Sequence, residues 1–226
     1  PMKRVAIPEL LDSDTGTARE VEDSLKDLQM INRWFGGAQV MSDLLYQVAV
    51  QRRLESLCWL DVAGASGDIA GLAQKSLARK GVRLEPILLD RAATHLNGDI
   101  PSICSDALAL PFRNDSLDVV GCSLFAHHLE PHEIAKFAAE ALRVARHAVV
   151  ISDLIRHRLH LALAYAGWLL YRSRLTRHDA PASVRRAYKV AEMKDILKPV
   201  SAAAIEVRHF YLFRMGVILW KKPNTT

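Results

Sequence analysis

Three aspartates, Asp61, Asp90 and Asp106, each follow a short apolar segment. The first opens the sequence DVAGASGD over residues 61–68, between an apolar run and a helical pattern, which predicts a strand, a tight loop and a helix start. Ligands of parallel sheets bind beyond the carboxyl ends of the strands, so we expect the three carboxylates to converge on one ligand. A carboxylate at Asp61 would repel a pyrophosphate and attract an ammonium or sulfonium group. Asp90, about 20 residues beyond the loop, can accept hydrogen bonds from ribose hydroxyls.

Alternating strand and helix patterns must position these acids. Apolar runs predict strands at 57–62, 84–90, 100–104, 117–123 and 148–153, and helical spacing predicts helices at 69–79 and 131–144. Two more runs, at 204–213 and 215–220, predict a C-terminal hairpin. The expected fold class is α/β: a doubly wound, Rossmann-like, mostly parallel sheet of about seven strands with an antiparallel C-terminal edge strand.

The length of 226 residues fits one domain. We expect a single domain over 1–226, made of a helical N-terminal cap (1–54), a cofactor-binding core (55–153), a helical lid insertion (154–199) and C-terminal strands (200–226). Within the cap, Gly36 and Gly37 predict a break between helices.

Three segments resemble one family. The loop at 61–68 is similar to the D-x-A-G-G-T-G-D loop of the ubiquinone/menaquinone C-methyltransferases, within the class I S-adenosylmethionine-dependent methyltransferases, with Ala65 in place of one glycine. The sequence SDALALPF at 105–112 resembles the family's A-D-A-x-x-L-P-F segment. Asn32, Phe35 and Gly36 match a D-x-x-N-x-x-x-S-F-G segment loosely.

This resemblance covers about residues 29–153 and implies S-adenosylmethionine as the cofactor, with Asp106 holding the adenine amino group. The residues expected to hold the cofactor are Asp61, Ala63, Gly64, Ser66, Gly67, Asp90, Arg91, Asp106, Ala107 and Ser123.

The predicted fourth strand leads into SLFAHHLEP at 123–131. Many class I methyltransferases carry a similar L-H-H-L segment beside the methionine end of the cofactor, whereas the quinone enzymes differ here. His127 or His128 can act as a base for a phenol or enol acceptor, or can pack against the cofactor. His178, in a polar segment (177–188) that we expect to be a loop leading into a helix, is a further candidate. A zinc site of His127, His128 and His132 lacks a completing ligand, so we predict no metal.

An apolar segment at 159–171 lies between arginine-rich flanks. It is too short to cross a bilayer. We expect a lid with apolar lining over a hydrophobic small-molecule acceptor, which is phenolic, quinone-like or polyketide-like. A peripheral membrane contact through 155–177 is the alternative.

Charge is divided unevenly along the chain. Residues 1–150 carry a net charge of −4 (16 Lys and Arg against 20 Asp and Glu), and residues 151–226 carry +9 (14 against 5). The basic residues flank an apolar segment and form no continuous basic run, so we do not expect nucleic acid as a partner. Three cysteines without metal-like spacing predict buried free thiols, and the absence of an apolar leader predicts a cytoplasmic protein.

Two other functions compete with methyl transfer. A dinucleotide-dependent oxidoreductase is disfavoured by Asp61 and by the missing glycines of the loop. A protein that binds S-adenosylmethionine without turnover, as a membrane-associated partner of an enzyme complex, stays open because Ala65 replaces a family glycine. The sequence makes no prediction of the oligomeric state.

Overall fold

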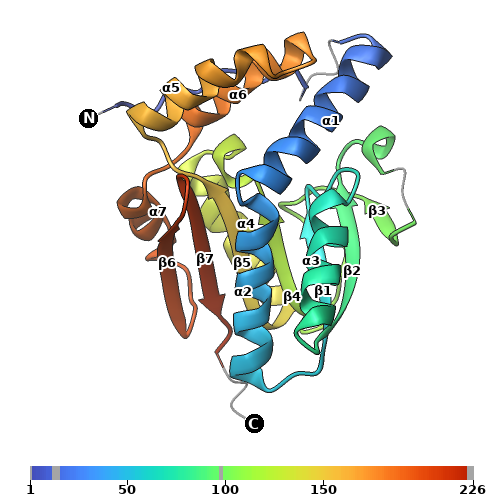
Figure 1. Cartoon of the computed structure of the whole chain (residues 1–226). Coiled ribbons are helices and arrows are strands. Elements are labelled where there is room, and N and C mark those ends of the chain that lie inside the picture. Colours follow the sequence, from blue (N-terminus) through green and yellow to red (C-terminus); the bar gives the residue numbers. More distant parts are fainter. Residues whose placement is uncertain (1, 12–15, 97–98, 223–226) are drawn as a thin grey trace.

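The computed structural model describes residues 2–11, 16–96 and 99–222. Seven strands form one sheet in the order β3-β2-β1-β4-β5-β7-β6 (Figure 1). Their bounds are β1 (Ser56–Val62), β2 (Arg83–Asp90), β3 (Ser102–Cys104), β4 (Leu117–Ser123), β5 (Ala145–Leu154), β6 (Ala204–Phe210) and β7 (Arg214–Trp220). The helices are α1 (Ala18–Trp34), α2 (Gly37–Arg52), α3 (Asp68–Arg79), α4 (Pro131–Val144), α5 (Arg158–Ala166), α6 (Arg174–Arg186) and α7 (Val190–Leu197), with short 3-10 turns η2 (Ala93–His95), η3 (Ala126–His128) and η4 (Gly167–Leu169).

The sheet has the predicted fold class. Strands β1 to β5 pair in parallel, and β7 pairs antiparallel with both β5 and β6. The β6–β7 hairpin places β7 between β5 and β6, so the antiparallel strand is the second from the edge of the sheet. In the register, Asp61 lies opposite Leu88 of β2 and Gly121 of β4, so that the carboxyl ends of these three strands meet at one edge.

Helices cover both faces of the sheet. One apolar core joins the sheet to α2 and α3, and a second joins it to α4 and α7. The central strands β1 and β4 are almost entirely buried, which explains their continuous apolar runs. Trp59 and Phe137, both fully buried, fill the first and the second core respectively.

A cap of helices lies beyond the carboxyl ends of the parallel strands, where α1, α5 and α6 cross above the sheet (Figure 1). The expectation of a loop at the start of 177–188 is wrong, because α6 continues to Arg186 with Pro181 inside it. A proline lacks an N–H and therefore removes one helical hydrogen bond. Burial of Leu175, Ala182 and Val184 holds this helix in place nevertheless.

The N-terminal segment 2–11 lies against α6 and η3, and we call it the N-terminal strap. The Val5 N–H donates to the Arg185 carbonyl oxygen at 3.1 Å. The side chain of Asp179 on α6 accepts the N–H groups of Leu10 and Leu11 at 2.8 and 3.0 Å. The strap thus joins the cap helices to the core.

The three cysteines are free, as predicted, but only Cys122 is buried, while Cys58 is half-buried and Cys104 is exposed. Cys104 ends the short edge strand β3, where only one neighbouring strand covers it. No helix among the described residues is long and apolar enough to span a membrane.

Candidate cofactor and acceptor site

A cavity of about 730 Å³ lies at the carboxyl ends of β1, β2 and β4, beneath the cap. Its floor carries the polar strand ends, and its roof carries apolar side chains of α1 and α5, including Leu28, Ile31 and Leu163. All the predicted cofactor residues line this cavity except Gly67, which is the N-cap of α3 and ends the loop. One site therefore contains the acids that the sequence places at three separate strand ends.

Tight backbone geometry shapes the loop after β1. A Cβ atom on Gly64 would lie 3.0 Å from the Asp61 carbonyl oxygen, and Gly67 has a φ of +73°. Both positions therefore favour glycine. Ala63 and Ala65 also have positive φ values, 58° and 42°, which cost an L-residue roughly 1–2 kcal/mol each. The loop thus keeps its shape with alanine instead of glycine at position 65, at the cost of some backbone strain.

Asp61 is the most perturbed acid of the site. Its side chain is buried, and its Oδ1 has no hydrogen-bond partner among the described residues. Burial, with the charges of Asp68 and Asp90 adding to it, raises the pKa of Asp61 well above its ordinary value. A cation bound at this point would relieve both effects.

Asp90 connects two loops around the cavity. Its Oδ2 accepts the Ala65 N–H at 3.2 Å, and its Oδ1 accepts the Ala92 N–H at 3.0 Å. Asp106 is exposed at the cavity wall and accepts the Leu108 N–H at 2.8 Å. Ser123, at the end of β4, has a buried hydroxyl with no hydrogen-bond partner in the part of the chain that the structure describes.

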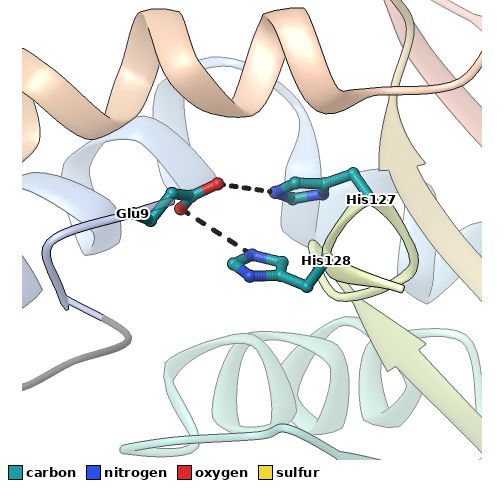
Figure 2. A group of neighbouring side chains, drawn as sticks. All are labelled: Glu9, His127 and His128. Carbon is teal, nitrogen blue, oxygen red and sulfur yellow. Dashed lines mark ion pairs between the residues drawn. The ribbon is translucent and has the colours of Figure 1, made fainter. Parts of the chain in front are cut away.

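The two predicted histidines meet a carboxylate from the N-terminal strap (Figure 2). His127 Nε2 lies 3.5 Å from Glu9 Oε1, and His128 Nε2 lies 3.7 Å from Glu9 Oε2. On its other side, His127 Nδ1 lies 2.6 Å from Oδ1 of Asp153, a buried residue of β5. Glu9 and Asp153 therefore hold His127 between two carboxylates.

This arrangement fixes the charge of His127. Burial lowers its pKa, but Asp153 and Glu9 outweigh burial and raise the pKa to about 10. Conversely, although burial opposes it, the pair with His127 keeps the pKa of Asp153 below its ordinary value. His127 is thus held as the protonated partner of two carboxylates. His128 is half-buried and also lines the cavity.

A metal ion is the other group that these side chains suggest. The potential ligand atoms of Glu9, His127 and His128 all lie within 4.8 Å of one another. However, the Ser183 hydroxyl donates to Glu9 Oε1 at 2.9 Å, and Arg186 Nη1 lies 3.9 Å from the same oxygen. With these donors beside Glu9 and a proton on His127, the charges already compensate one another. We therefore interpret the cluster as an ion-pair network.

The structure does not bring His178 to the site. Its side chain is exposed on α6, pairs with Asp179 at 2.8 Å, and is not part of the cavity wall. His132 is exposed on α4 and lies outside the cavity wall as well. Glu9, Asp153 and Arg214 join the site without having been predicted. Of these three, only Asp153 had a local signal in the sequence, because it is an acid at the end of a predicted strand. Glu9 and Arg214 lie in terminal segments far from the matched motifs.

A Rossmann-like sheet with acids at the ends of β1 and β2 and after β3 is the architecture predicted for a class I methyltransferase. Comparisons with known proteins support this class. Residues 60–151 match the family described as a methyltransferase domain. A comparison with curated proteins gave no match.

Several solved structures share the fold. One is a SAM dependent methyltransferase from Aquifex aeolicus, with 16% identity, a TM-score of 0.50, and coverage of 74% of this chain and 82% of that chain. Another is the plantazolicin methyltransferase BpumL in complex with SAH, with 13% identity, a TM-score of 0.69, and coverage of 94% and 93%. The plantazolicin methyltransferase BamL has 13% identity, a TM-score of 0.65, and coverage of 90% and 91%. At these identities the likeness shows the fold, and together with the family match it supports an S-adenosylmethionine-dependent methyltransferase. The quinone C-methyltransferase subtype stays a prediction.

Proposed function

We propose that the protein transfers a methyl group from S-adenosylmethionine to an oxygen or carbon atom of a hydrophobic small molecule. The observation that carries this proposal is the division of one cavity into an acidic floor at the strand ends and an apolar roof under the cap. The floor suits a cationic nucleoside cofactor, and the roof suits a phenolic, quinone-like or polyketide-like acceptor.

The residues on the floor fit the cofactor. Asp61 and Ser123 both offer buried oxygen atoms without hydrogen-bond partners in the described chain, and the crowded carboxylates of Asp61, Asp68 and Asp90 favour a positively charged ligand. When bound, S-adenosylmethionine supplies an electrophilic methyl group on a sulfonium. We assign the ribose hydroxyls to Asp90 and the adenine amino group to Asp106.

The protein's own contribution is alignment. Holding a nucleophile and a methyl group in line is worth up to about 7–11 kcal/mol in favourable cases. Where the acceptor must lose a proton, we assign that proton to His128. Its replacement by alanine should lower kcat roughly 10²–10⁴-fold if proton removal limits the rate, and should leave the affinity for S-adenosylhomocysteine nearly unchanged.

The decisive experiment has two stages. Calorimetry with S-adenosylhomocysteine should show binding that Asp61→Ala abolishes and that the exposed control Arg79→Ala retains. Incubation with S-adenosylmethionine and a panel of phenolic and quinone acceptors should then give methylated products by mass spectrometry. Absence of binding to the wild-type protein would refute the proposal. Binding without transfer to any acceptor would favour the alternative of a cofactor-binding protein without turnover.

We infer that the segment that contains α5 and η4 is a lid over the cavity, and that its outer surface contacts a membrane. Leu163, Gly167 and Leu170 line the cavity, so this segment closes the acceptor side. Trp168 and Leu169 are outside the cavity wall and are 55% and 88% exposed. Exposed arginines flank this apolar surface, which is the combination that binds an anionic bilayer; they are Arg158, Arg172, Arg174 and Arg177.

Vesicles test this contact. Flotation with vesicles that contain anionic lipid should carry the wild-type protein, and the double replacement Trp168→Ser and Leu169→Ser should abolish it. Val50→Ser, an exposed apolar position on α2, is the matched control and should float like the wild type. Equal flotation of the double variant and the wild type would contradict a membrane contact at this surface.

A further inference from the structure

Arg214 is a buried cation at the cavity that has no role in the mechanism above. It begins β7, opposite Leu154 at the end of β5, and its side chain is only 2% exposed. Its Nε donates to the Phe35 carbonyl oxygen at 3.3 Å, and its Nη1 has no hydrogen-bond partner among the described residues. A buried guanidinium nitrogen without a partner is costly, so this atom calls for an acceptor.

The start of α2 adds a second positive group beside Arg214. Gly36 caps this 16-residue helix in a left-handed conformation, with no side chain that accepts the first N–H groups. A Cβ atom on Gly37 would lie 3.4 Å from Arg214 Nη2, which shows how closely the guanidinium approaches the helix start. The N-terminus of a helix carries a partial positive charge. Two positive groups therefore face each other, and an anion between them would satisfy both.

Asn32 links this positive region to the acids of the cavity floor. A Cβ atom on Gly37 would also lie 2.9 Å from Asn32 Oδ1, so Asn32 stands beside the helix start. Its Nδ2 donates to Asp68 Oδ2 at 3.2 Å, and Asp68 is near enough to Asp61 to raise the pKa of that acid. One wall of the cavity thus runs from two carboxylates, through an amide, to a guanidinium and a helix N-terminus.

We propose that Arg214 and the N-terminus of α2 bind the carboxylate of the cofactor's amino-acid portion, while Asp61 and Asp68 face its ammonium group. The inference rests on the proposed cofactor. It places the carboxylate and the ammonium of the amino-acid portion beside oppositely charged groups, on opposite sides of Asn32. The hydrogen bond to Phe35 engages only Nε of Arg214, so capping the end of α1 does not account for Nη1.

Calorimetry with paired ligands tests the assignment on the full chain. 5′-Methylthioadenosine keeps the nucleoside and thioether of S-adenosylhomocysteine and lacks the amino-acid portion. Arg214→Met should weaken S-adenosylhomocysteine binding about 10–100-fold, the range of one or two charged hydrogen bonds, and leave 5′-methylthioadenosine binding within about twofold. Arg79→Met, an exposed arginine at the end of α3, should change neither affinity. Equal weakening of both ligands by Arg214→Met would overturn the assignment.

A second measurement needs no variant. The wild-type protein should bind decarboxylated S-adenosylmethionine, which keeps the ammonium and the sulfonium, about 10–100-fold more weakly than S-adenosylmethionine. Equal affinities would overturn the carboxylate assignment and leave the proposed function standing. Binding of none of these nucleosides to the wild-type protein would instead refute the proposed function.

Discussion

Replacing Asp61 with asparagine is expected to stabilise the ligand-free protein and to weaken its affinity for S-adenosylmethionine. Burial and the charges of Asp68 and Asp90 disfavour the ionised form of Asp61 and raise its pKa. At pH 7, this penalty cannot exceed the free energy of protonating an ordinary aspartate, about 4 kcal/mol. Asparagine removes the penalty but buries an amide that must find partners, at a cost of about 1–3 kcal/mol.

Because about 4 kcal/mol is an upper limit for the penalty, the net gain in the free energy of unfolding should be at most about 1–3 kcal/mol. For a chain of this length, that gain corresponds to a rise in Tm of at most about 2–12 °C, measurable by differential scanning fluorimetry. The direction in which the penalty at Asp61 changes with pH follows from the raised pKa of Asp61 in the folded state. The penalty is absent below the unfolded pKa near 4, grows as the pH rises toward the folded pKa because only the folded form binds the proton in that window, and is complete above the folded pKa.

Three results together test this reasoning. The Tm difference between Asp61→Asn and the wild type should be largest near neutral pH and should shrink toward pH 4. Asp106→Asn, which changes an exposed acid of the same cavity, should leave the Tm unchanged. Saturating S-adenosylhomocysteine should stabilise the wild type more than the Asp61 variant. A variant that is less stable than the wild type by the same amount at every pH would refute the account.

Other perturbations give further tests. Asp153→Asn leaves a buried, charged His127 without its closest partner, and should lower the free energy of unfolding in urea by about 3–5 kcal/mol. A chelator should leave the Tm unchanged, because the ion pairs around Glu9 are complete without a metal; a fall in Tm that added Zn²⁺ restores would contradict the ion-pair interpretation. Burial lowers the pKa of His160, so the folded state resists its protonation and stability should be lost as the pH falls below about 6.5. Replacing His160 with phenylalanine keeps a ring that can stack on Phe213 and should flatten that decline in Tm, whereas an unchanged decline would exclude His160 as its cause.

Most of the sheet and the acidic floor could be predicted because their signals are local. Pro131 marks the first turn of α4, whose observed bounds agree with the expected helix at 131–144. The buried parallel strands produce continuous apolar runs, and the acids that follow them lie at the carboxyl edge by topology alone. Boundaries shifted where pairing extends a strand beyond its apolar run, as in β5, which begins at Ala145.

The roof of the cavity could not be predicted in the same way. Helix α6 combines a proline with polar residues, and its stability comes from burial against other elements and from the N-terminal strap. Glu9 meets His127 across 118 positions of the chain, and Arg214 approaches Gly37 across 177. No periodicity or spacing records such contacts, because they arise only when the cap is assembled on the sheet.

The N-terminal strap has a consequence for the order of events during synthesis. Glu9, Leu10 and Leu11 are made well before their partners Asp179 and Ser183 on α6, which follow about 170 positions later. At about 5–20 residues per second, roughly 10–30 s pass before those partners exist. During that interval the growing chain can build strands β1 to β5 on the ribosome, and the strap can contact η3, through Glu9 and the two histidines there, but not α6. Contact between the strap and α6, which closes the cavity, can therefore form only after strands β1 to β5 have been made.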